Sequence, residues 1–426
     1  MTESPAPHAR LGWWRGTPLY LRIMAGLILG LIVGVVIGPR AAPLAIPAKL
    51  VLRILGALAP GLILVAIMHV LLTAKIEARN AGKLVYLLLL NTLVAIIVGL
   101  LVANVLRPGH WYGQTRTPTD SHLPSSPDVL GQVLENVPKS LLGPLTDEGK
   151  VIGVILIALA FGLALRSMPS VKTKPIVDLV EVLMQAFVKI LHWIIEVVPL
   201  AVFGIVASLV GEKGFAPFRA LGAFVVAVIA ALILQAIYYL VRIRFGSWVR
   251  PMHLLRNTGD ALVMAFSTSS SVVTMPLTYE CLRDRVGLRE KSASLGALVG
   301  SNFNNDGTAL YEAMSALFIS QMLVASGVAQ PLDLGQQFLV VITSVFASLG
   351  AAGIPEAGLV TMTMVFRAVH LPVEYIALLL PVDWFLDRCR TCINVMGDMN
   401  VSCLLDGKKQ PGRDELHPIA APADLL

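Results

Sequence analysis

The chain alternates between long apolar stretches and short polar segments. Six apolar stretches are long enough to be helical spans of a bilayer, and they run over residues 20–38, 46–72, 84–106, 151–165, 176–210 and 218–241. The fifth stretch contains Pro199, which predicts a kink or a break at that point. This pattern predicts an all-α polytopic membrane protein.

The pattern of apolar and polar residues changes after Arg256, where each apolar segment contains a polar cluster near its middle. These clusters occupy residues 267–271, 302–308, 348–358 and 383–398. Unsatisfied backbone and charged groups are costly in hydrocarbon, so we expect the clusters to face protein or a water-filled cavity. The first and third clusters each lie between two apolar arms too short to span alone. They predict two re-entrant helical hairpins, and the two hairpin-plus-span units run in opposite directions, as an inverted repeat.

Composition and charge placement support a membrane protein. Hydrophobic residues make up 56% of the chain and charged residues 14%, which is more apolar surface than a soluble domain can bury. Lys and Arg cluster in alternate short loops, which predicts cytoplasmic N- and C-termini in a bacterial inner membrane. The basic residues flank the spans and form no separate domain, so the net charge of +6 does not indicate a nucleic-acid partner.

The last apolar segment carries the sharpest chemical signal. Asp387, Arg390, Thr391, Asn394 and Asp398 share one face of a helix, in a stripe about 16 Å long. The stripe suits an amphoteric substrate, with Asp387 for an ammonium group, Arg390 for a carboxylate in a two-pronged contact, and Asn394 for a second carboxylate. The alternative is a structural ladder of ion pairs inside a helix bundle.

Three further segments are candidates for ion and substrate binding. Residues 304–308 (Asn-Asn-Asp-Gly-Thr) predict an unwound turn in which Asp306 and backbone carbonyls bind sodium, and a simple helix kink at Gly307 is the alternative. The Ser-rich cluster 267–271 offers hydroxyls and helix N-terminal amides to a carboxylate. The third cluster suits either a mobile external gate or a passive turn.

Glu312 lies six residues after Asp306 in the same span. A buried carboxylate at this place can carry a proton or pair with an arginine, and the sequence leaves both roles open.

These four motifs, in this order, resemble the glutamate/aspartate transporter family, the dicarboxylate/amino acid:cation symporters. The resemblance covers nearly the whole chain and is strongest between Ser267 and Asp398. It implies eight transmembrane helices, two re-entrant hairpins, a homotrimer and an elevator-type motion with the second hairpin as external gate. On this basis we divide the chain into a cytoplasmic N-terminal segment (1–17), mainly scaffold and trimerisation spans (18–250), a transport core (251–406) and a disordered cytoplasmic tail (407–426). Spans 3 and 6 are expected to move with the core.

The resemblance also implies roles for individual residues. Asp387 corresponds to the residue that binds the substrate amino group, and Arg390 to the one that binds its side-chain carboxylate. Further substrate ligands are implied at Thr308, Thr391, Asn394, Ser270, Ser271 and Gly353. A first sodium site is implied at Gly300, Asn304, Asn394 and Asp398. A second is implied at Asp306 with Asn304, and a third at the backbone of Asn302 with Ser348, Leu349 and Ala351.

The chain departs from the family pattern near the sodium ligands. Asn305 stands where the family has methionine, and Leu88, Asn91 and Thr92 stand where its cation-site tyrosine, threonine and serine occur. Glu312 matches the animal members, in which this glutamate carries a coupled proton. Coupling to sodium, to protons or to both therefore follows as a hypothesis, with no other cofactor.

The joint presence of Asp387 and Arg390 favours L-glutamate or L-aspartate as the substrate. In the family, members that carry neutral amino acids lack the arginine, and members that carry C4-dicarboxylates lack the aspartate. These two substrate classes are the alternatives within the family. An anion-conducting channel is an alternative from another class. An intramembrane enzyme is not expected, because the histidines of the spans lie on separate segments without a nucleophile. The expected partners are the small-molecule substrate, membrane lipid and two further copies of the chain.

Overall fold

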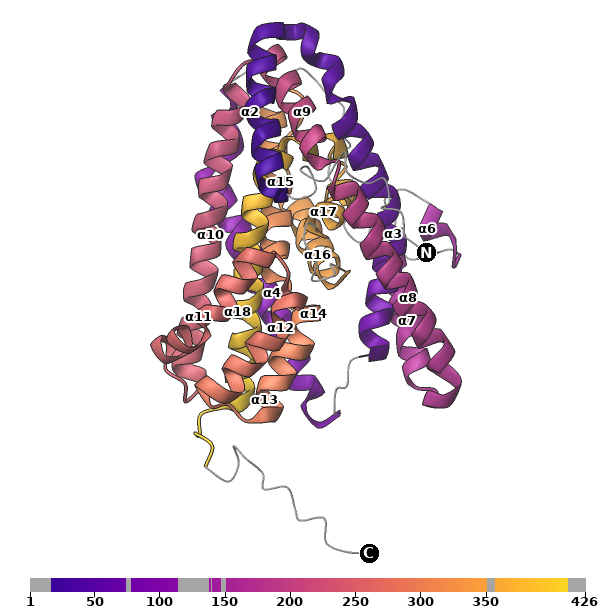
Figure 1. The fold of residues 1–426 in the computed structure, drawn as a ribbon, viewed down its shortest axis with the longest axis vertical. Helices are drawn as coiled ribbons and strands as arrows, with labels where there is room; N and C mark the ends of the chain where they lie inside the picture. Colours follow the sequence, from indigo (N-terminus) through magenta and orange to yellow (C-terminus); the bar gives the residue numbers. More distant parts are fainter. Residues whose placement is uncertain are drawn as a thin grey trace, which may run out of the picture.

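The computed structural model describes residues 17–73, 78–113, 138, 140–146, 151–350 and 357–412. All regular elements in these ranges are helical (Figure 1). The first half consists of α2 (Leu19–Ile37), α3 (Ile46–Thr73), α4 (Ala78–Leu106), α7 (Val151–Arg166), α8 (Ser170–Ile195), α9 (Val198–Lys213) and α10 (Ala216–Gly246), with the short α6 (Gly143–Thr146) before α7. The six predicted apolar stretches are therefore helical, and α8 and α9 together form the fifth.

Length and composition identify membrane-spanning candidates among the described helices. Four continuous helical runs qualify, and the bent pair Val171–Ile195 and Val198–Lys213 is a fifth if it is one span. One of the four runs, Leu19–Thr73, comprises α2, the 3₁₀ segment η1 (Gly38–Ala45) and α3. Figure 1 shows the chain reversing direction at η1, so α2 and α3 are two antiparallel helices. The total of eight spans stays a prediction.

The break in the fifth stretch lies where Pro199 predicts it. The two segments meet at an angle of 43°, and Pro199 stands in the first turn of α9. Proline lacks an N–H group and clashes with the carbonyl four residues earlier, so the helix cannot continue through it unbent. Glu196 lies at the bend and pairs with Arg22 of α2 at 2.5 Å.

The first polar cluster forms a turn between two helices. The helix α11 (Pro251–Thr268) ends at Ser269, whose φ of 52° is left-handed, and α12 (Ser271–Glu280) begins directly afterwards. The hydroxyl of Ser270 caps α12 by accepting a hydrogen bond from the Val273 amide at 3.2 Å. A π-helical segment, η3 (Cys281–Val286), continues the second arm. The position of this hairpin within a bilayer stays a prediction.

The second polar cluster interrupts a helical run, as predicted. The run consists of α13 (Glu290–Ser294), the π-helical η4 (Leu295–Val299), α14 (Gly300–Phe303) and α15 (Asp306–Ala325). Asn304 and Asn305 leave the helical conformation, with ψ of 80° and 48°. The Asn304 amide still donates to the carbonyl of Gly300 at 2.7 Å, and the Asn305 carbonyl still accepts from the Ala309 amide at 2.9 Å, so the helical run is interrupted between these two residues.

The remaining helices form the centre of the molecule together with α15. They are α16 (Leu334–Gly350), α17 (Ala357–Ala368), the 3₁₀ segment η5 (Val373–Leu378) and α18 (Leu380–Asp406). Figure 1 shows α15 to α18 between α10 on one side and α3, α7 and α8 on the other. The predicted tip of the second hairpin, with Ala351 and Gly353, lies outside the described residues.

The chain beyond α18 follows a defined course for six residues. A disordered tail was predicted from residue 407, but the structure describes Gly407 to Gly412. The carbonyl of Gly407 accepts a hydrogen bond from the Trp248 amide at 3.0 Å. The carbonyl of Lys409 accepts one from Arg289 at 3.3 Å, so this segment is attached to the helical body.

Candidate functional site

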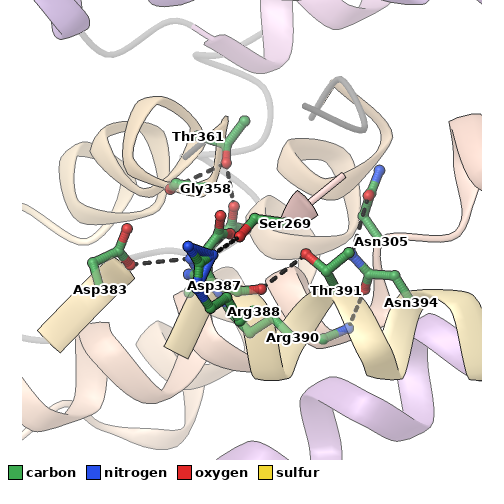
Figure 2. Close-up of polar contacts among 12 residues, drawn as sticks. Ser269, Asn305, Gly358, Thr361, Asp383, Asp387, Arg388, Arg390, Thr391 and Asn394 are labelled. Atoms are coloured by element: carbon green, nitrogen blue, oxygen red, sulfur yellow. Dashed lines mark hydrogen bonds and ion pairs between the residues drawn. The ribbon is translucent and has the colours of Figure 1, made fainter. Parts of the chain in front are cut away.

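The two residues on which the substrate prediction depends are in contact. Arg390 is fully buried in α18, and its Nη2 atom lies 2.8 Å from Asp387 Oδ1. The same nitrogen lies 3.1 Å from Oδ1 of Asp383, one turn before Asp387 (Figure 2). The guanidinium also lies over the Tyr311 ring of α15, 4.0 Å from its centroid. One cation therefore faces two carboxylates and an aromatic ring.

The Arg390 guanidinium also has unused donors. Its Nε and Nη1 atoms are buried and have no hydrogen-bond partner among the described residues. Nη1 is directed at Gly358 of α17, where an added Cβ would lie 3.1 Å from this atom. The same added Cβ would lie 3.3 Å from the methyl carbon of Thr308. These contacts place α15, α17 and α18 around the unsatisfied Nη1 donor of Arg390.

The other two stripe residues near Arg390 attach α18 to its surroundings. The Thr391 hydroxyl donates to the carbonyl of Asp387 at 2.8 Å. Asn394 Oδ1 accepts from the Gly307 amide at 2.8 Å, and Asn394 Nδ2 donates to Asn305 Oδ1 at 3.4 Å (Figure 2). The predicted stripe on α18 therefore faces the predicted break before α15.

The residues of the first implied sodium site converge. Asn304 Nδ2 donates to the carbonyl of Asn394 at 3.0 Å and to Asp398 Oδ1 at 3.2 Å. A Cβ on Gly300 would lie 2.6 Å from the same Asp398 oxygen. Asn304 Oδ1 is buried without a hydrogen-bond partner. The group combines oxygens of a carboxylate, an amide and a main-chain carbonyl, which are hard ligands.

The second implied sodium site pairs Asp306 with Asn304, and both border Gly397, where an added Cβ would lie 2.1 Å from Asn304 Nδ2 and 3.0 Å from Asp306 Oδ2. The Asp306 side chain is the carboxylate of this site. This fully buried carboxylate accepts a hydrogen bond from the Thr92 hydroxyl at 2.6 Å and a second, short one from the Tyr239 hydroxyl. Asn91 does not contact Asp306 directly. Its side chain instead accepts from Arg242 and donates to Asn400 Oδ1 at 3.4 Å. Of the two candidates on α4, only Thr92 touches the carboxylate.

The third implied group lies only in part within the described residues. Asn305 Nδ2 donates to the carbonyl of Ser348 at 3.0 Å, which joins the break before α15 to the end of α16. The side chain of Asn302 turns back to the carbonyl of Leu298 at 3.1 Å. The Leu349 side chain and all of Ala351 lie outside the described residues, as does the substrate candidate Gly353.

The first hairpin meets α14 and α18 at its tip. The hydroxyl of Ser271 donates to the carbonyl of Ser301 at 3.1 Å, while Ser270 caps its own helix. Ser269 accepts a hydrogen bond from Arg388 Nη1 at 2.7 Å (Figure 2). The tip of the first hairpin is therefore joined to α14 through Ser271 and to α18 through Ser269.

Glu312 lies within electrostatic range of Arg390 but is not hydrogen-bonded to it. It is fully buried, and its Oε1 atom accepts a short hydrogen bond from the Thr361 hydroxyl of α17. Its Oε2 atom has no hydrogen-bond partner among the described residues. Glu312 also forms no ion pair with any arginine of the described ranges, so the interpretation as an arginine partner finds no contact to support it.

Sequence reasoning missed several residues that complete these groups. Asp383 could have been found, because it precedes Asp387 by four residues and so shares its helix face. Tyr239, Tyr311 and Thr361 had no such signal. They lie 67, 79 and 49 positions from their respective partners in sequence, as their residue numbers show, and helical periodicity carries no information over such separations.

Comparison with known proteins identifies relatives of the chain. A family model described as "Sodium:dicarboxylate symporter family" matches residues 19–408. "Excitatory amino acid transporter 3" of Homo sapiens is 37% identical over 262 residues, which cover 61% of this chain and 48% of that protein. "Excitatory amino acid transporter 4" of Rattus norvegicus is 37% identical over 298 residues, which cover 65% of this chain and 51% of that protein. The chain spans about half the length of the curated relatives it matches.

Proposed function

Because the chain belongs to the sodium:dicarboxylate symporter family, we propose that it is a secondary active transporter that carries an acidic amino acid together with sodium. Its several apolar helices make it a multi-pass membrane protein. The observation that carries the substrate assignment is the buried contact between Asp387 and Arg390. The relatives named as excitatory amino acid transporters support the same class of substrate.

In this proposal each stripe residue has a distinct task. The free Nη1 donor of Arg390 binds the side-chain carboxylate of L-aspartate or L-glutamate in a charge-assisted hydrogen bond. Asp387 binds the substrate ammonium, while Asp383 continues to balance the arginine. Thr308, Thr391 and Asn394 supply further polar contacts. The site is buried, so these charge–charge contacts act at a lower effective dielectric than in water.

Sodium is proposed to bind at the two groups that the structure assembles. The first uses Asn304, Asp398 and the Asn394 carbonyl, whose oxygens surround the break before α15. The second uses Asp306 beside Thr92. Asn304 belongs to the first group and Asp306 to the second, so both groups lie in the segment 304–307. The same segment bonds to Asn394 through Asn304, Asn305 and Gly307. Ion binding and substrate binding would therefore order the same short segment, which is a physical basis for coupling.

Proton coupling through Glu312 is a second part of the proposal. A buried glutamate without an ion-pair partner favours its neutral form, because burial disfavours the charged carboxylate, and its free Oε2 atom can hold the proton. Its partner Thr361 lies on α17, three residues after Gly358, which faces Arg390. A change in the protonation of Glu312 can therefore alter the position of α17 beside Arg390.

The wider mechanism is proposed from the family resemblance. The chain would form a homotrimer in a bacterial inner membrane with cytoplasmic termini. The helices from α11 to α18 would move as an elevator against a scaffold, with the α16–α17 hairpin as the external gate. Cross-linking of a purified sample and cysteine accessibility from each side of the membrane test these points.

Uptake into proteoliposomes tests the function. Labelled L-aspartate should accumulate above equilibrium when an inward sodium gradient is imposed, and an imposed proton gradient separates proton coupling from sodium coupling. Passive equilibration without accumulation would instead indicate a channel. Competition by succinate or by a neutral amino acid distinguishes the two alternative substrate classes.

Arg390→Ala should reduce L-aspartate uptake by at least about 100-fold, because a buried charge-assisted pair is lost. Arg390→Lys keeps the charge but not the planar array of guanidinium donors, so it should raise KM more than it lowers the maximal rate. The matched control is Arg256→Ala, the same change at an exposed position of α11. Normal aspartate uptake by Arg390→Ala would contradict the substrate assignment.

A further inference from the structure

A basic cavity lies where α18 ends, away from the substrate site. Its volume is about 400 Å³. It is lined by the basic side chains of Lys83, Arg289, Lys291, Lys408 and Lys409 together with the carboxylate of Asp406. Figure 1 shows α13 and the end of α18 at the same end of the molecule. Five cations thus surround one small space.

The single carboxylate of the cavity is already engaged. The Asp406 side chain is fully buried, and its Oδ2 atom accepts a hydrogen bond from Trp248 Nε1 at 2.6 Å. Its Oδ1 atom accepts one from the Arg289 amide at 3.0 Å, and Arg289 Nη1 lies 3.3 Å from Oδ2. Asp406 and Arg289 neutralise each other, and the lysines that line the cavity add positive charge that attracts an anion.

The lysines are held in place by main-chain contacts. Arg289 Nη1 donates to the carbonyl of Lys409 at 3.3 Å, and Trp248 N donates to the carbonyl of Gly407 at 3.0 Å. Gly407 has a left-handed φ of 83°, which turns the chain across the end of α18. Lys83 reaches the same place from α4, with Nζ donating to the carbonyl of Leu404 at 2.8 Å. The cavity is therefore built by three separate helices.

The cavity lies beside surface that is suited to lipid. Leu295 and Leu405 line it along with the lysines. The end of α10 packs against α18 here, since an added Cβ on Gly246 would meet Leu404. The preceding residue, Phe245, is 71% exposed. Tryptophan with a hydrogen-bonded N–H group, such as Trp248, is typical of the boundary between hydrocarbon and headgroups. A ligand with both a charged head and an apolar tail fits this place better than free phosphate.

We propose that the basic cavity binds the phosphate-bearing headgroup of an anionic phospholipid. The lysines of α4, α13 and the segment after α18 bind the phosphate, and the acyl chains lie along the apolar surface beside Leu405 and Phe245. Basic pockets on the cytoplasmic side of membrane proteins bind such headgroups. One bound lipid would bridge α4 to the last helix, and so would stabilise the folded chain by mass action.

Thermal unfolding of the full-length protein in detergent tests this. Palmitoyl-oleoyl phosphatidylglycerol should raise the melting temperature in a saturable way, while the zwitterionic phosphatidylcholine with the same chains should not. The double variant Lys408→Gln/Lys409→Gln should need a higher concentration of phosphatidylglycerol, by about fivefold for each lysine removed. The matched control is Lys172→Gln/Lys174→Gln at the start of α8, which removes equal charge from exposed positions.

Three outcomes would overturn the proposal. The first is equal affinity for phosphatidylglycerol in the Lys408/Lys409 variant and in the control. The second is a saturable stabilisation by inorganic phosphate alone with no further gain from the lipid, which would assign the cavity to a free anion. The third is no stabilisation of the unaltered protein by either probe. Native mass spectrometry counts the lipids retained by each variant. It measures lipid binding directly, even if one variant has a low melting temperature.

Discussion

The outer helices and the central helices of this protein place their side chains in opposite ways. On the outer helices, large apolar side chains are exposed, as with Val36 of α2 at 77% and Val171 of α8 at 86%. In the centre, Asp306, Glu312 and Arg390 are all 0% exposed. A water-soluble protein has the reverse arrangement.

The contrast follows from the solvent. Lipid tails are as apolar as leucine, so an exposed apolar face costs nothing in a bilayer, and packing there brings no hydrophobic gain. Charged groups find no partners in hydrocarbon, so they collect in the centre and must satisfy one another. The central contacts of Arg390, Asn304 and Asp306 are therefore required for folding as well as for the proposed function.

The largest expected effect comes from removing the central cation. Arg390→Met should destabilise the protein by about 3–5 kcal/mol, because Asp383 and Asp387 then share a buried site without a counter-charge. The melting temperature in detergent measures this. Adding Asp383→Asn to Arg390→Met should recover part of the loss. If the double variant is less stable than Arg390→Met alone, the two carboxylates are not balanced by this arginine.

A charge on the outer face should cost somewhat less. Leu29, in the middle of α2, is 54% exposed, and Leu29→Arg should cost about 2.5–3.5 kcal/mol of insertion free energy. The amount of full-length protein in the membrane fraction reports this, with Leu29→Ala as the control at the same position. Equal membrane yields for the two variants would show that this face meets water or protein.

An intermediate effect is expected where the central helices approach closely. A Cβ on Gly397 of α18 would lie 2.1 Å from Asn304 Nδ2 and 3.0 Å from Asp306 Oδ2. Gly397→Ala should therefore cost about 1–3 kcal/mol and raise the sodium concentration needed for half-maximal uptake. The control is Gly222→Ala on α10, where an added Cβ meets nothing within 4 Å. That change should be neutral or slightly stabilising.

The smallest effect on stability is expected at Glu312. Glutamine preserves the shape of the side chain and can still accept the Thr361 hydrogen bond, so Glu312→Gln should change the free energy of unfolding by less than about 1 kcal/mol. If Glu312 carries the proton, uptake by the unaltered protein should fall as external pH rises, and uptake by the variant should not depend on pH. A variant that keeps the original pH profile would exclude Glu312 as the carrier.

Much of the local architecture was readable from the sequence. The six apolar stretches, the bend at Pro199 and the break at Asn304–Asn305 follow from helix length, from proline's missing N–H group and from polar residues within apolar runs. The stripe from Asp387 to Asp398 was readable because a helix brings residues three and four apart onto one face. All of these are properties of neighbouring residues.

The tertiary structure decided which helices lie in the centre and which partner each buried charge receives. An apolar helix gives the same sequence signal whether it faces lipid or protein, because both are equally apolar. Tyr311 beside Arg390, Tyr239 beside Asp306 and Thr361 beside Glu312 come from helices distant in sequence. Only the packing of those helices could bring them together, since no local periodicity links residues separated by whole spans.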